Sequence, residues 1–168
     1  GIFSMVPLAN ATPETIRETC EGWEQICLMN VDGKAPVDYA FGPMILLDPG
    51  SLAFDLPKSY GYRLIFKDLE DYIEGMSLPS WHQWISYETK YLNRDLITDL
   101  TIASLEYSIN LRERCGFYGR QEADTARFCF VEASKQTVDV VNDAMNIHDE
   151  RERLERLKAF QAFLESEL

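Results

Sequence analysis

The sequence lacks the signatures by which enzymes and membrane proteins are commonly recognised. It has no run of about eighteen apolar residues, which excludes a membrane-spanning helix. It also has no phosphate-binding loop, dinucleotide-binding glycine motif, nucleophile elbow or pair of catalytic carboxylates. Histidine occurs only twice, and neither copy has the spacing of a zinc motif. We therefore expect no cofactor and no metal, and the pattern favours a non-enzymatic protein.

Positive charge is also scarce. The chain has 16 basic residues against 28 acidic ones, which gives a formal net charge of −12. Because such a surface repels phosphates and anionic lipid headgroups, nucleic-acid and membrane-surface binding are disfavoured, except through a locally basic loop. A basic protein partner is compatible with this charge, including one for which the chain acts as a nucleic-acid decoy.

The four cysteines form no disulfide framework and no CxxC pair. Cys20 and Cys27 fall on one face of a predicted helix, about 10 Å apart along its axis, which is too far for a mutual bridge. No secretory signal peptide is recognisable. We therefore expect reduced cysteines and a cytoplasmic, intracellular location.

The most apolar helical pattern lies between residues 93 and 114. Its apolar side chains recur at helical spacing and cover most of the circumference, so this helix should be surrounded by other elements. Asn93 is expected as its N-terminal cap. The principal face comprises Leu96, Leu100, Ala103, Tyr107 and Leu111, and further positions are filled by Ile97, Ile102, Leu105 and Ile109.

Other helices are predicted around this central one. Residues 13–29 are expected to form a helix that starts at the Thr-Pro-Glu run 12–14. Residues 81–92 are expected to form another, which starts with a capping box between Ser80 and Gln83. Residues 60–74 read as a helix ended by Gly75, although residues 61–67 also fit a strand that leads into a shorter helix.

Residues 34–58 are the least helical part, and residues 43–56 within them form the candidate β-hairpin or irregular segment. The run Asp48-Pro49-Gly50-Ser51 suits a type II turn, because glycine accepts a positive φ. The flanking apolar residues fit either a short β-hairpin or an irregular packed segment.

The last 48 residues contain neither glycine nor proline. A single helix over 121–168 would be roughly 70 Å long. We expect it either to break near His148 and Asp149, where a second capping signal occurs, or to project from the body. Its first apolar stripe is predicted to comprise Ala126, Phe130, Ala133, Thr137, Val140, Ala144 and Ile147.

These patterns predict a mainly α protein, a single-domain helical bundle over 1–168 with a short β-hairpin or irregular segment in its N-terminal third. The expected parts are an extended arm (1–11), a helical and irregular part (12–92), a central helical hairpin (93–148) and a charged C-terminal helix (149–168).

The predicted function is a protein-interaction or assembly module that forms a homo-oligomer or docks a protein partner. Late apolar residues at 150–168 indicate self-association, and a basic, aromatic loop offers a second contact site. The residues predicted to bind a protein partner are Arg112, Arg114, Phe117, Tyr118, Arg120, Leu157, Phe160 and Leu164.

An alternative reading is a helical ligand-binding or enzymatic domain. Aromatic side chains cluster around one histidine, and such a wall can line a pocket. The residues of this alternative pocket are Trp81, His82, Trp84, Tyr87 and Tyr91.

Overall fold

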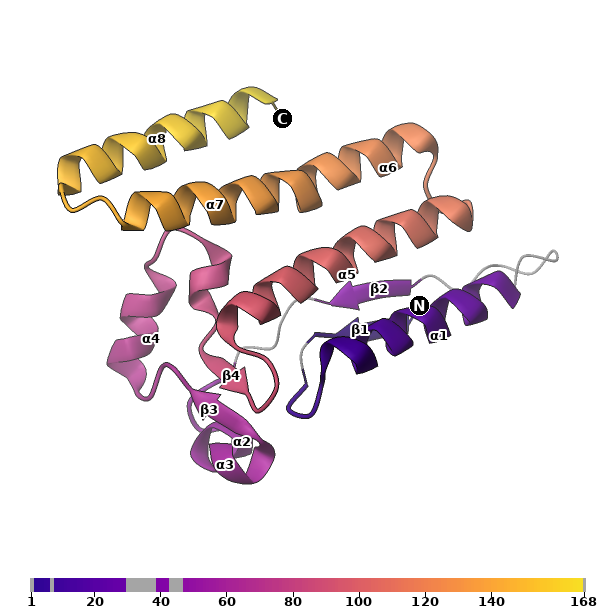
Figure 1. Cartoon of the computed structure of the whole chain (residues 1–168), viewed down its shortest axis with the longest axis horizontal. Coiled ribbons are helices and arrows are strands. Elements are labelled where there is room, and N and C mark those ends of the chain that lie inside the picture. The colour runs from indigo at the N-terminus through magenta and orange to yellow at the C-terminus, as the bar shows by residue number, and fades with distance from the viewer. Residues whose placement is uncertain (1, 7, 30–38, 43–46, 168) are drawn as a thin grey trace.

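The computed structural model describes residues 2–6, 8–29, 39–42 and 47–167, and their structure is mainly helical (Figure 1). Small strand pairs accompany the helices. Strand β1 (Ile2–Met5) pairs in parallel with β2 (Tyr39–Gly42), and β3 (Tyr62–Leu64) pairs antiparallel with β4 (Tyr87–Thr89). The predicted fold class, mainly α with a minor β component, is confirmed.

Long helices follow one another back and forth across the molecule (Figure 1). Helix α5 (Arg94–Arg114) is followed by a continuous helical stretch formed by α6 (Arg120–Ala126), the π-helical turn η2 (Arg127–Glu132) and α7 (Ala133–Met145). Helix α8 (Glu150–Glu167) then folds back along α7. Asp149 caps α8 by accepting a 2.8 Å hydrogen bond from the Glu152 amide, so the predicted break at His148–Asp149 is confirmed.

Helix α5 lies between α1 (Pro13–Met29) and the α6–α7 stretch. Its start is confirmed, because Asn93 accepts a hydrogen bond from the Leu96 amide. Its buried side is less apolar than expected. Thr98, Thr101, Ser104 and Ser108 are buried beside the isoleucines, whereas Ala103, which we expected on the principal apolar face, is exposed.

Small hydroxyl residues fit this buried position for a physical reason. The Thr101 hydroxyl donates to the Ile97 carbonyl at 2.7 Å, so its polarity is satisfied within the helix itself. Their small size also allows neighbouring backbones to approach α5 closely. An all-apolar circumference is therefore not needed for a central helix.

The predicted hairpin at 43–56 is confirmed only at its turn. Gly50 has a φ of +88°, and the Ser51 amide donates to the Asp48 carbonyl at 3.0 Å. The expected second strand is instead helix α2 (Leu52–Asp55), because the Ser51 hydroxyl caps it by accepting from the Phe54 amide. Residues 43–46 lie outside the described part of the chain. Helix α3 (Pro57–Tyr60) follows directly.

Two further helix predictions are corrected. The strand alternative at 61–67 is right, because β3 precedes the shorter helix α4 (Leu69–Met76), and Gly75 lies inside α4 and not beyond its end. The predicted helix 81–92 is wrong: a 3₁₀ turn, η1 (Trp81–Trp84), leads into strand β4. Pairing with β3 supplies the backbone hydrogen bonds that a local helix would otherwise make.

Candidate functional site

The π-helical turn η2 changes which side chains of the α6–α7 stretch face outward. The Ala133 amide donates to the carbonyl of Phe128, five residues earlier, so this turn holds one more residue than an α-helical turn. As a result Val131 is 1% exposed, whereas Phe130, predicted for the inward stripe, is 57% exposed. The same shift brings Val141 inward instead of Val140. Turns of this kind frequently occur at functional sites.

The outward turn creates an apolar groove next to the predicted basic loop. Tyr118 comes from the loop that follows α5, and Phe130 comes from η2. We call this the π-turn groove; its lining residues are Tyr118, Gln121, Glu122, Thr125, Ala126, Cys129 and Phe130. Sequence reasoning placed Tyr118 in a contact site but missed Phe130. A five-residue interval between inward positions Ala126 and Val131 is the signal that could have revealed it.

The arginines of the predicted loop are largely engaged with their own chain. Arg112 stacks over the Tyr118 ring, 5.3 Å from its centroid, and donates to its hydroxyl at 2.8 Å. Arg114 pairs with Glu24 of α1 at 2.5 Å. Arg120 is 91% exposed and lies 4.0 Å from Asp124, while Phe117 is half-buried. These contacts fix the loop and leave Tyr118 as its member in the groove.

A second groove runs between α8 and α7. The predicted residues Leu157, Phe160 and Leu164 are brought together here and are half-buried against the protein's own surface. We call it the α7–α8 groove; its lining residues are Pro79, Thr137, Val141, Leu154, Leu157, Lys158, Phe160, Gln161 and Leu164. Leu154 is 47% exposed and Phe163 is 45% exposed, and the Phe163 ring stacks 6.3 Å from that of Phe160.

The five aromatic-segment residues are not gathered on one open face. Tyr87 is fully buried and meets Tyr62 edge to face at 5.1 Å. Trp84 donates its indole N–H to the Leu78 carbonyl at 2.9 Å, and Trp81 packs partly buried against the core. Tyr91 is 47% exposed, beside Lys90.

His82, the remaining member of that set, ties η1 to helix α7. Its ring contacts the Ser80 hydroxyl at 2.8 Å through Nδ1 and the Asn142 side-chain oxygen at 3.2 Å through Nε2. Burial lowers the pKa of His82, and the Arg94 charge lowers it further. The neutral imidazole therefore acts as a buried structural link.

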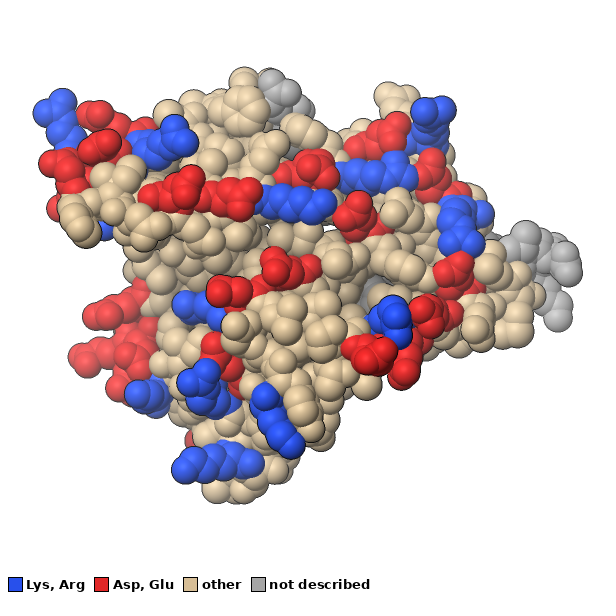
Figure 2. Space-filling view, in the orientation of Figure 1, with Lys and Arg blue, Asp and Glu red and all other residues tan. Residues whose placement is uncertain are grey.

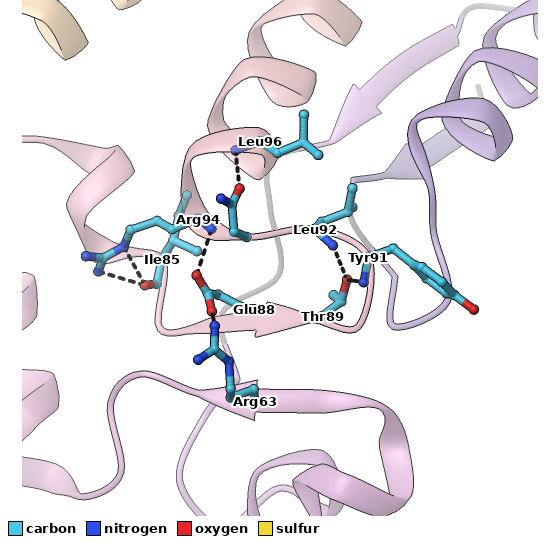
Figure 3. A network of polar contacts seen from close by, with 9 residues as sticks. Arg63, Ile85, Glu88, Thr89, Tyr91, Leu92, Arg94 and Leu96 are labelled. Carbon is cyan, nitrogen blue, oxygen red and sulfur yellow. Dashed lines mark hydrogen bonds and ion pairs between the residues drawn. The ribbon is translucent and has the colours of Figure 1, made fainter.

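A polar network fixes the junction of β4 and α5 (Figure 3). The Arg94 guanidinium donates to the Gln83 carbonyl at 2.5 Å and to the Ile85 carbonyl at 2.8 Å. Glu88 accepts from the Arg94 amide at 3.2 Å and pairs with Arg63 of β3. Burial lowers the pKa of the Arg94 side chain. This network explains why residues after Trp84 leave the helical path. The Arg94 side chain faces backbone carbonyls, whereas Arg63 and Glu88 also line a surface pocket beside Tyr91.

The described residues contain no group of three or more histidine, cysteine or acidic side chains arranged to hold a metal ion. Among them, no helix combines the length and the apolar character needed to cross a membrane. None of the four cysteines is part of a disulfide bond.

Comparisons with protein-family models, curated proteins and solved structures yield no match to this chain. Its functional assignment therefore depends on the geometry of its own surfaces.

Proposed function

We propose that this protein is a non-enzymatic assembly module that self-associates through the α7–α8 groove. The observation that carries the proposal is the exposure of Leu154, which lines a mainly apolar groove, and of Phe163, which stacks on the groove residue Phe160. Leu154 and Phe163 lie about 180° apart around α8, so a second copy would bury both by packing on the two sides of that helix. Large apolar side chains of this kind commonly anchor interfaces.

The charge distribution supports contact between copies at this place. The chain as a whole carries a formal charge of −12, which opposes self-association at most surfaces. Between residues 149 and 164, however, four acidic residues alternate with four basic ones, so the formal charge is zero. Figure 2 shows acidic and basic side chains mixed at the end of the molecule where α7 turns into α8. Two copies could therefore meet here without strong repulsion.

Sedimentation equilibrium of the wild type and of a Leu154→Ser/Phe163→Ser variant tests this proposal. We expect the wild type to exceed the mass of one chain at micromolar concentration, and the variant to sediment as a single chain. Phe130→Ser is the control, because it removes a ring that is also exposed, 57% against 45% for Phe163, from a different surface. A single-chain mass for the wild type, or an unchanged assembly in the double variant, would refute self-association through this groove.

The π-turn groove supports a second candidate function, the docking of a protein partner. The supporting observation is the 57% exposure of Phe130 next to Tyr118, at a helical irregularity that turns the ring outward. Capture experiments with matched variants test it. A specific partner should be retained by wild type and by Leu154→Ser/Phe163→Ser but lost by Phe130→Ser. A partner captured equally by all three would contradict docking here.

The ligand-binding or enzymatic alternative has weaker support. A pocket walled by the aromatic segment would need His82 and Tyr87 to face a ligand, and both are buried within the fold. Tryptophan fluorescence against a metabolite panel would test this reading, and a saturable quench would favour it.

A further inference from the structure

Helix α4 displays an apolar stripe that the fold does not cover. Leu69 is 67% exposed, Ile73 is 64% exposed and Met76 is 40% exposed. Their spacing of four and three residues places them within about 60° of one another around the helix. The helix packs on the molecule through a different side, with Tyr72 and Gly75 buried against Phe66. The exposed stripe is therefore not the core-facing surface of α4.

Acidic residues occupy the neighbouring side of the same helix. Asp68, Glu70, Asp71 and Glu74 fall within residues 68–76, and this range contains no basic residue. Glu70 and Glu74 lie about 100° to 140° from Leu69 around the helix, directly beyond the apolar stripe. Figure 2 shows acidic side chains gathered along the edge of the molecule formed by α4.

Apolar anchors at i, i+4 and i+7 are the pattern by which a helix enters a groove on another protein. The acidic side determines what kind of groove fits. A second copy of this chain, with its formal charge of −12, would repel α4, and an anionic lipid surface would do the same. A surface with lysine or arginine along its border would instead attract it.

We propose that α4 is a docking helix for a partner protein with an apolar face bordered by basic residues. Leu69, Ile73 and Met76 insert into the apolar face, and Glu70 and Glu74 pair with the basic border. This contact is separate from the α7–α8 groove, so the protein can bind the partner and a second copy at once.

The test uses a fluorescently labelled peptide made of leucine and lysine at helical spacing, which presents an apolar face bordered by positive charge. Fluorescence anisotropy measures its binding to the full-length chain. The variants are Leu69→Ser/Ile73→Ser, which removes two anchors, and Glu70→Gln/Glu74→Gln, which removes the acidic side. Leu154→Ser/Phe163→Ser is the matched control on the other surface. All replaced side chains are exposed, and circular dichroism verifies that each variant is folded.

We expect the two α4 variants to bind at least about tenfold more weakly than wild type, while the control binds as wild type does. Raising the salt concentration from 50 to 500 mM should weaken wild-type binding, but should affect the Glu70→Gln/Glu74→Gln variant much less.

Several results would overturn the proposal. One is that the wild-type protein does not bind the leucine–lysine peptide. Another is that Leu69→Ser/Ile73→Ser binds the peptide as tightly as wild type does. A third is that wild type binds a peptide with serine in place of leucine as tightly as the original peptide. Binding of wild type to neutral phosphatidylcholine vesicles, lost in the same variant, would assign the stripe to a lipid surface. A lower sedimentation mass for Leu69→Ser/Ile73→Ser would assign it to a second copy.

Discussion

Replacing Gly75 by alanine should destabilise the protein although it strengthens a helix. A Cβ atom added at Gly75 would lie 2.1 Å from Cζ of Phe66. Ordinary carbon–carbon contact needs about 3.5 Å, so the ring would have to retreat by about 1.4 Å. Phe66 is only 7% exposed, and it meets Tyr72 edge to face at 5.3 Å and the Arg94 guanidinium at 5.7 Å. The ring therefore cannot retreat without breaking these contacts.

The magnitude follows from two opposing effects. Alanine gains about 1 kcal/mol over glycine in a helix interior, whereas severe overpacking costs about 3 kcal/mol. The net loss in free energy of unfolding is about 2 kcal/mol, which lowers the melting temperature by about 4–8 °C in a chain of this size. Gly22→Ala is the matched control, because apart from its chain neighbours and its own helix backbone no atom lies within 4 Å of the added Cβ. It should raise the melting temperature by about 2–4 °C.

Thermal and urea unfolding followed by circular dichroism measure both variants. A second substitution, Phe66→Leu, removes the ring atoms that clash and should recover part of the loss in Gly75→Ala. The double-mutant cycle then gives a coupling energy between the two positions. If Gly75→Ala is as stable as Gly22→Ala, or if the cycle shows no coupling, the close packing of Phe66 on α4 is refuted.

Three other perturbations probe the links between elements. Arg94→Ala should lower the free energy of unfolding by about 2–3 kcal/mol in urea titrations, because two backbone carbonyls lose a charged donor; Arg94→Lys should recover only part. Burial lowers the pKa of His82, so its contribution to stability is present above about pH 6.5 and is lost as the pH falls toward the folded-state pKa. His82→Asn should therefore lose less stability than wild type between pH 7 and pH 5 in urea titrations at each pH. Deleting Phe130 should convert the π turn to an α turn and keep the melting temperature, whereas deleting Lys135 in α7 should lower it by rotating every later inward residue out of phase.

The elements predicted correctly are those whose signals are local. Asn93 and Asp149 cap the helices that follow them, and each cap uses an amide only three residues away. The same is true of Gly50, whose positive φ is required by its own turn. Such contacts involve neighbouring residues, so the sequence alone contains the physical reason for them.

The elements predicted wrongly depend on distant partners. Residues 87–89 form a strand because residues 62–64 pair with them. No local pattern within residues 81–92 predicts that pairing. Gly75 resembles a helix end, yet it lies inside α4 because Phe66 needs the space that a side chain would fill. In both cases a tertiary contact overrides a weak local preference.

The candidate sites also divide into residues predicted from local spacing and residues whose position depends on distant contacts. Leu157, Phe160 and Leu164 share a groove as their helical spacing predicts, because α8 is a regular helix. Phe130 was predicted to face inward, and this was wrong because one additional residue in η2 rotates the following part of the helix. That rotation keeps Val131 aligned with the core formed by Ile102 and Ile109, and it turns Phe130 outward.

The π turn also explains how the α6–α7 stretch can pack against the core and still expose the Phe130 ring. A regular α-helix would keep every residue of a 3.6-residue repeat on the same side, so an exposed phenylalanine would have to interrupt the repeat. One additional residue in the turn resets the phase instead. Ala126 before the turn and Val141 after it are both buried, and Phe130 between them is free to make an external contact. The outward ring thus costs the protein no inward packing, which is compatible with the proposed docking of a partner at Phe130.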